Sequence, residues 1–128
     1  VHKMKLNKRQ VEKIVKMLKN NEYIIDTLVE RAGNMIEDCD EEQDVLEEGD
    51  YLLINYSAEG DVRITKEPST YFTPGWMDEE LVYNIYVDSI EWFVPNDDDD
   101  RSLFVDAESL DKINESLKDL YHTKEYNY

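Results

Sequence analysis

LVYNIYVDSIEWFV, residues 81–94, is the segment that decides the fold. Apolar residues alternate in one frame through its first half and in the opposite frame through its second half: Leu81, Tyr83, Ile85 and Val87, then Ile90, Trp92 and Val94. Strict alternation is typical of a β-strand with one buried face. The change of frame requires one extra residue near Asp88 and Ser89. We therefore predict a β-bulge there, which bends the strand and increases its twist.

Two more strands are predicted on the amino-terminal side of this segment. Residues 51–56 and 61–66 both alternate in the manner of strands, and residues 57–60 between them are typical of a turn, which predicts a hairpin. Residues 67–80 contain two prolines and a glycine, which predicts a long loop. Residues 103–105 would add a fourth, short strand at the edge of the sheet.

Helices are predicted at both ends of the chain. Asn7 and Gln10 have the spacing of a capping box, and an apolar stripe with helical periodicity follows: Val11, Ile14, Val15 and Leu18. After Asn20 and Asn21, a second helix is predicted to continue to about residue 39. Asp106 is placed to cap a last helix. The apolar stripe of that helix consists of Leu110, Ile113, Leu117, Leu120 and Tyr121.

The sequence therefore predicts one α+β domain over residues 1–128, with elements in the order α-α-β-β-β-α. Its sheet is mostly antiparallel, with three strands, or four with residues 103–105. Two amino-terminal helices and one carboxy-terminal helix cover the sheet. Residues 1–5 and 123–128 are expected to be frayed. A chain of 128 residues is long enough to bury roughly two-thirds of the surface that it exposes when unfolded.

Charge divides the chain sharply. The formal net charge is −17, yet the first nineteen residues hold seven of the fourteen basic residues and only one acid, Glu12. Such a distribution favours a protein partner with a basic surface and disfavours direct binding of nucleic acid. No apolar run approaches the ~20 residues that cross a bilayer, so no membrane is expected. The single cysteine, Cys39, fits a reducing compartment, and we predict a cytoplasmic protein.

No catalytic, cofactor or metal motif is evident. His2 and His122 lie in no pattern that would position a catalytic base, and the acids around Cys39 are expected to raise the pKa of its thiol. The calcium-loop pattern begins at Asp38 but fails, because Gln43 replaces its glycine and Gly49 its last acid. A similar segment from residue 96 fails at the same two places. We predict a non-enzymatic protein with no cofactor and no metal.

Two acidic segments and one aromatic loop supply the candidate partner-binding residues. Residues 37–50 contain nine acids and no base, and this stretch is predicted to be a solvated helix end or loop. The acidic candidates are Glu37, Asp38, Asp40, Glu41, Glu42, Asp44, Glu47 and Glu48, with Asp97, Asp98, Asp99 and Asp100 secondary. The aromatic candidates are Tyr71, Phe72 and Trp76, because aromatic residues are frequent interface hot spots. The alternative is that their loop folds back as a lid on the sheet.

Residues 50–121 resemble small uncharacterised acidic proteins of bacteriophages and integrated mobile elements. The resemblance rests on the loop Tyr71-Phe72-Thr73-Pro74-Gly75-Trp76-Met77-Asp78-Glu79-Glu80, on a strand ending in Asp88-Ser89-Ile90-Glu91 and on the closing helix. It transfers no catalytic residue. Some phage proteins of this size and acidity resemble DNA in charge and block nucleases or DNA-binding defence proteins, which is an analogy at the level of the class.

These features favour a non-enzymatic acidic binding protein, of the phage inhibitor or DNA-mimic type, that engages a basic or nucleic-acid-binding partner. One alternative is a structural or assembly protein that self-associates as a homo-oligomer through its basic amino-terminal helix and its acidic segments. A third hypothesis is a hydrolase with an unrecognised carboxylate site. That hypothesis requires a cleft with two convergent buried acids.

Overall fold

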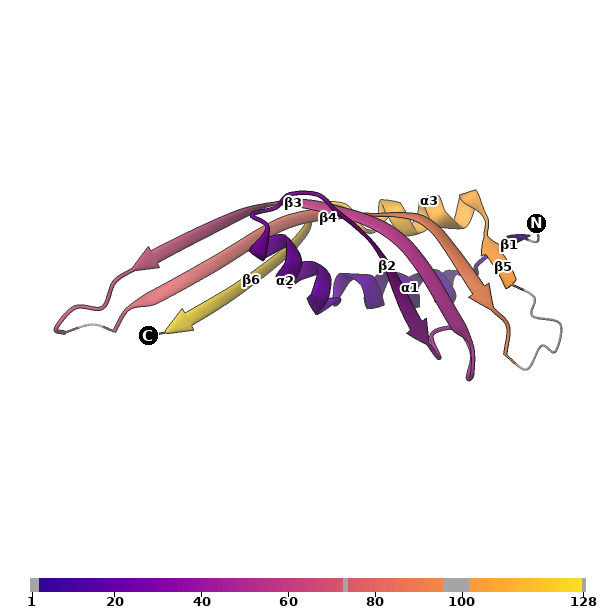
Figure 1. Ribbon diagram of the computed structural model, residues 1–128, viewed down its shortest axis with the longest axis horizontal. Helices are drawn as coiled ribbons and strands as arrows, with labels where there is room; N and C mark the ends of the chain where they lie inside the picture. The colour runs from indigo at the N-terminus through magenta and orange to yellow at the C-terminus, as the bar shows by residue number, and fades with distance from the viewer. Residues whose placement is uncertain (1–2, 73, 96–101, 128) are drawn as a thin grey trace.

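The computed structural model describes residues 3–72, 74–95 and 102–127. Its elements are β1 (Lys3–Met4), α1 (Lys8–Lys19), α2 (Glu22–Glu30), β2 (Ile36–Gln43), β3 (Tyr51–Glu67), β4 (Trp76–Phe93), β5 (Ser102–Val105), α3 (Ala107–Glu115) and β6 (Leu120–Asn127). The predicted α+β class is confirmed. The sheet has six strands rather than three or four. Only two residues separate α1 from α2, so these helices form one bent segment (Figure 1).

The long hairpin of β3 and β4 is the spine of the sheet. The strand order is β1-β5-β4-β3-β2, and β6 pairs with the end of β4 that β5 leaves free. All of these pairings are antiparallel except that of β1 with β5. The far half of the hairpin extends beyond the helices with β6 beside it (Figure 1). We call residues 61–67, 76–82 and 121–127 the arm, and residues 68–75 its tip.

The predicted bulge in β4 is confirmed. Asn55 pairs with Ser89 and Tyr56 pairs with Val87, so Asp88 is the extra residue. On both sides of it the predicted apolar residues are buried: Leu81, Tyr83, Ile85 and Val87 before it, Ile90 and Trp92 after it. The bulge therefore keeps one face of β4 against the core from Leu81 to Trp92.

The predicted turn at residues 57–60 is wrong, because β3 runs through it without interruption. The backbone N–H of Gly60 donates to the carbonyl oxygen of Gly33 at 3.1 Å. A Cβ added to Gly33 would overlap the carbonyl oxygen of Gly60. A glycine inside a strand often marks such a close backbone approach rather than a turn. The loop of the hairpin is correspondingly shorter than predicted and comprises residues 68–75 only.

The amino-terminal helices begin as predicted, but the second ends early. The Asn7 and Gln10 capping box is present, and the α1 stripe is buried. Asn21 caps α2, accepting from the Ile24 N–H at 3.2 Å. However, α2 stops at Glu30 rather than near residue 39, because the backbone turns at Ala32 and Gly33, both with positive φ. The first part of the acidic segment predicted as a helix end or loop, residues 37–43, then lies in strand β2, whereas residues 44–50 form a loop as predicted.

The carboxy-terminal part also differs from the prediction. Asp106 caps α3 as expected, accepting from the Ser109 N–H at 2.9 Å. The helix ends at Glu115, and residues 120–127 form β6, so the tail expected to be frayed is paired with β4 up to Asn127. Lys3 and Met4, also expected to be frayed, pair with β5. Residues 103–105 lie in the predicted edge strand, β5.

β5 and β6 pair with the two ends of the same edge of β4. Between them, α3 and the turn after it take the place of a neighbouring strand. The side chain of Asn114 accepts from the Val87 N–H at 2.7 Å and donates to the Val87 carbonyl oxygen at 3.1 Å. The Ile85 N–H donates to the Leu117 carbonyl oxygen at 3.0 Å. These bonds satisfy backbone groups that a neighbouring strand would otherwise pair.

The core lies between the bent helical segment and the concave side of the curved sheet (Figure 1). Fully buried side chains from the two layers meet there: Ile14, Leu18, Ile24 and Leu28 from the helices, and Leu52, Ile54, Leu81, Ile85 and Ile90 from the strands. The helices do not extend along the arm (Figure 1). In the described part of the chain, no helix has the length and apolar character needed to cross a membrane.

Candidate functional site

β2 is an edge strand whose carboxylates point to both faces of the sheet. Its first residue, Ile36, is buried opposite Ala58, so the even-numbered side chains face the helices and the odd-numbered ones face the opposite side. The helix-facing carboxylates are Asp38, Asp40 and Glu42, and the others are Glu37 and Glu41. Asp40 and Glu42 are half-buried, whereas Glu37, Asp38 and Glu41 are exposed.

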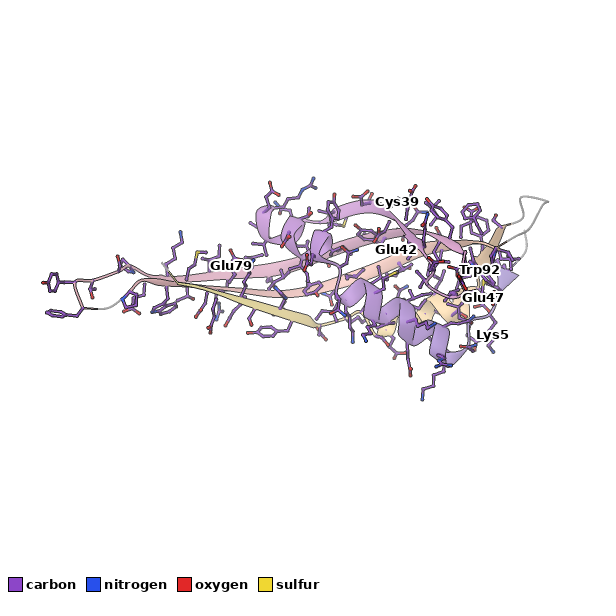
Figure 2. All side chains as sticks on the ribbon, turned by 90° about the horizontal axis from the view of Figure 1, so that it is seen from below. Lys5, Cys39, Glu42, Glu47, Glu79 and Trp92 are labelled. Carbon is purple, nitrogen blue, oxygen red and sulfur yellow. The ribbon has the colours of Figure 1, made fainter. Side chains whose placement is uncertain are left out.

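A cleft of about 460 Å³ lies between β2 and the junction of α1 with α2, and we call it the acidic cleft. Asp40 and Glu42 line one side, together with the ring of Tyr56 from β3. Asn21 and Tyr23 line the helical side. In Figure 2, Glu42 and Cys39 lie on this half of the molecule, whereas Glu79 lies on the arm.

Two side chains of the helical segment hold the carboxylates in place. The Asn21 amide donates to Asp40 Oδ2 at 2.7 Å while its Oδ1 caps α2, so one residue fixes Asp40 relative to the helix. The Tyr23 hydroxyl donates to Asp38 Oδ2 at 2.9 Å. Neither residue was among those predicted from the sequence. The only available signal was that Asn21 lies at a predicted helix boundary.

Proton affinities in the acidic cleft differ from one carboxyl to the next. Burial raises the pKa of Asp40 above its usual value, against the opposing effect of the Asn21 hydrogen bond. Burial and the charge of Asp40 raise the pKa of Glu42. By contrast, hydrogen bonds from the Cys39 N–H and the Tyr23 hydroxyl lower the pKa of Asp38. A raised carboxyl pKa means that the charged form is under-stabilised, and a nearby cation would stabilise it.

Other groups along β2 respond to the same charges. Burial, followed by the charges of Asp38 and Asp40, raises the pKa of Tyr56, so its hydroxyl stays protonated at neutral pH. On the opposite face, a hydrogen bond with Glu41 raises the pKa of Tyr51 to about 12. Desolvation and the neighbouring acids raise the pKa of Cys39, the direction expected from the sequence. The thiol is exposed but is disfavoured as a thiolate nucleophile.

The carboxylates of β2 have no basic partner within ion-pairing distance among the described residues. Lys5 and Lys112 form ion pairs with Glu108 of α3 at 3.6 and 3.7 Å. Arg31 acts on Asp38 only at longer range. Among the described acids, none forms an ion pair with the exposed basic residues of α1: Lys8, Arg9, Lys13, Lys16 and Lys19. The two charged surfaces are therefore not neutralised by each other.

The remaining acids of this segment lie in the loop after β2. Glu47 and Glu48 are exposed there, and Asp44 accepts from the Gly49 N–H. The loop is organised by Asp50, which is 1% exposed and accepts hydrogen bonds from four donors. Asp50 is thus a structural residue, although in sequence it looks like one more acid of the run. Asp97 to Asp100 lie outside the described residues.

Two of the aromatic candidates lie at the tip of the arm. Tyr71 is 94% exposed and Phe72 90% exposed, so they do not cover the sheet, and the lid interpretation is wrong for them. Trp76 is half-buried at the start of β4. Figure 1 shows the tip and β2 in opposite halves of the molecule. The predicted partner-binding residues therefore form two separate surfaces rather than one.

The described residues do not supply the pair of convergent buried acids that the hydrolase hypothesis needs. Asp50 is the one described acid that is buried, and its oxygens are engaged by the protein itself. Within the described part of the chain, no group of three or more His, Cys, Asp and Glu side chains is arranged to hold a metal ion. Comparison with protein-family models, curated proteins and solved structures finds no match to this chain.

Proposed function

We propose that this protein is a non-enzymatic binding protein whose acidic cleft receives lysine or arginine side chains of a basic or nucleic-acid-binding protein. The observation that carries the proposal is the pair Asp40 and Glu42. Both are half-buried in a 460 Å³ cleft, both have a raised pKa, and no described cation pairs with them. An entering ammonium or guanidinium group would supply the missing charge and form charge-assisted hydrogen bonds.

The spacing of charge along β2 supports a partner that normally binds a polyanion. From Glu37 to Glu42 the strand carries five carboxylates in six residues. At ~3.3 Å per residue, this corresponds to roughly one charge every 4 Å. One DNA strand carries a phosphate about every 3.4 Å along the helix axis. A basic groove that encloses this sheet edge from both faces would meet a comparable linear charge density, which fits an inhibitor of the phage type.

A simpler role for the same acids is protection of the sheet edge. Charged side chains on an edge strand discourage the addition of strands from other molecules. That role needs neither the half-burial of Asp40 and Glu42 nor their fixed position against α2. The experiment must therefore separate the acidic cleft from net charge. We also propose that the protein works in a reducing compartment such as the cytoplasm, where the exposed Cys39 stays a free thiol.

Matched variants make this separation. The cleft variant carries Asp40→Asn and Glu42→Gln, and the control carries Asp26→Asn and Glu30→Gln, which are exposed helical acids. Each variant loses two negative charges. Affinity for a fluorescent arginine-rich peptide is measured by anisotropy at low and high salt. We expect the cleft variant to bind at least about tenfold more weakly than the control.

The pH dependence gives a second readout. Binding of a cation lowers the raised pKa values of Asp40 and Glu42, so peptide affinity of the wild type should increase as pH rises through them. The cleft variant should lose most of this increase, and the control should keep it. Equal weakening of the two variants would show that only net charge matters and would contradict the proposal.

A further inference from the structure

The tip of the arm presents an aromatic pair that no other described residue covers. Tyr71 and Phe72 are almost fully exposed, and their rings pack edge to face with centroids 4.9 Å apart at an angle of 82°. The pair is thus a preformed unit rather than two independent side chains. Large exposed apolar groups at the end of a projecting element are typical of an interaction surface.

The tip is uncharged but stands on an acidic arm. Residues 68–75 contain no charged residue, whereas the arm contains six acids and three bases. Glu67 is the last residue of β3, and Asp78 pairs with Thr65 close to the tip. A surface that accepts this tip therefore needs an apolar floor and a positive rim.

Such a surface lies between α1 and α3. Two adjoining cavities of about 390 and 470 Å³ share Val11, Glu12 and Ser116, and we call them together the helix groove. Leu6, Val11 and Val15 contribute its apolar floor. Its rim has four lysines, among them Lys8 and Lys16, against two glutamates. Cavities of this size are typical of sites that take up apolar groups.

We propose that the tip of one molecule docks in the helix groove of a second copy, with Tyr71 and Phe72 against the apolar floor and the acidic arm against the lysines. The tip cannot reach its own groove, because the two lie in opposite halves of the elongated molecule (Figure 1). Two antiparallel copies can make the contact twice. The result is a closed dimer with two identical interfaces.

This dimer is independent of the function proposed above. The helix groove contains no carboxylate of β2, and Asn20 is the one residue that lines both the groove and the acidic cleft. A second copy is favoured over a foreign protein because both complementary surfaces, the acidic aromatic tip and the basic apolar groove, belong to this chain. The basic amino-terminal helix then has an acidic counterpart in the dimer, which it lacks in the monomer.

Sedimentation velocity over a concentration series at low and high salt tests the proposal. The tip variant carries Tyr71→Ser and Phe72→Ser, and the groove variant carries Lys8→Glu and Lys16→Glu. Controls are Tyr86→Ser and Lys118→Glu, which change exposed residues outside both surfaces. All four substituted positions of the test variants are exposed, so the fold should persist, as circular dichroism would verify. We expect each test variant to raise the dimer dissociation constant at least about tenfold, with the controls unchanged.

Mixing the variants gives the sharper result. A heterodimer of the tip variant with the groove variant keeps one intact contact, whereas each variant alone keeps none, so the mixture should associate more strongly than either component. A wild type that is monomeric at every concentration overturns the proposal, as does a tip or groove variant that dimerises like the wild type. Cosedimentation of a monomeric wild type with phosphatidylcholine vesicles, lost in the tip variant, would assign the tip to lipid and also overturn it.

Discussion

Trp92 donates its indole N–H to a carboxylate oxygen of Asp50 at 3.1 Å, inside the protein. The same carboxylate accepts three backbone N–H groups of the loop after β2, from Val45, Leu46 and Glu47, at 2.8 to 2.9 Å. Burial of an ionised carboxylate is costly unless it is fully hydrogen-bonded, and four donors meet that requirement. The contact therefore ties the loop that ends the acidic strand to β4.

Replacement of Asp50 should destabilise the protein strongly. Asp50→Ala leaves three backbone N–H groups and the Trp92 indole without their acceptor, and we expect a loss of about 3 kcal/mol in the free energy of unfolding. Urea denaturation followed by tryptophan fluorescence measures it. Glu48→Ala, an exposed acid of the same loop, is the control and should stay within about 0.5 kcal/mol of wild type. Similar losses for both would argue against the hydrogen-bonded role of Asp50.

Gly33 and Gly49 allow backbone strain to be separated from close packing. Both have nearly the same positive φ, +82° and +83°. An added Cβ on Gly49 meets only the Cβ of Pro95 at 3.4 Å, whereas one on Gly33 overlaps the backbone of Gly60. Gly49→Ala should cost about 1 kcal/mol from the φ angle alone. Gly33→Ala should cost at least about 2 kcal/mol more, because β3 must move. Chemical denaturation measures both, and equal losses would contradict the packing argument.

Asn114 should protect the middle of β4 from solvent. Its side chain occupies both backbone groups of Val87, so Asn114→Ala removes two buried hydrogen bonds at once. We expect a loss of about 2 kcal/mol and faster hydrogen exchange of the Val87 amide, measured by NMR. Asn55→Ala is a suitable control, because it removes an exposed side-chain bond to Ser89 on the same hairpin. Unchanged exchange at Val87 would show that α3 does not replace a strand there.

Local sequence signals predicted those parts of the fold that depend on neighbouring residues. The frame shift at Asp88, the capping box of Asn7 and the cap at Asp106 each involve residues close in the chain, and all three are confirmed. The strand β2 was missed because five acids in eight residues favour a solvated loop, and only pairing with β3 makes this segment a strand. Gly60 was misread as part of a turn because its partner, Gly33, is distant in sequence.

The candidate site was predictable in composition but not in arrangement. The acids of β2 were chosen from the sequence, yet the pattern did not show that Asp40 and Glu42 face the helices or that Asn21 and Tyr23 hold them. Those features depend on the crossing of α2 over the edge of the sheet. Likewise, the exposure of Tyr71 and Phe72 follows from the length of the hairpin, which the wrongly predicted turn at residues 57–60 concealed.

Glu42 and Asp38 should respond to pH with opposite sign. The pKa of Glu42 is raised from 4.5, so the folded state holds this proton more tightly than the unfolded state does. Stability therefore falls as the pH rises from the unfolded pKa through the folded pKa. Glu42→Gln should therefore gain stability relative to wild type between about pH 3 and about pH 7. The pKa of Asp38 is lowered from 3.8, so its contribution is present above that value and disappears as pH falls through the folded pKa. Asp38→Asn should accordingly lose stability relative to wild type over the same interval. Urea denaturation at both pH values measures the two differences, and a shared sign would mean that overall charge repulsion, rather than the local environment of each carboxyl, controls the pH dependence.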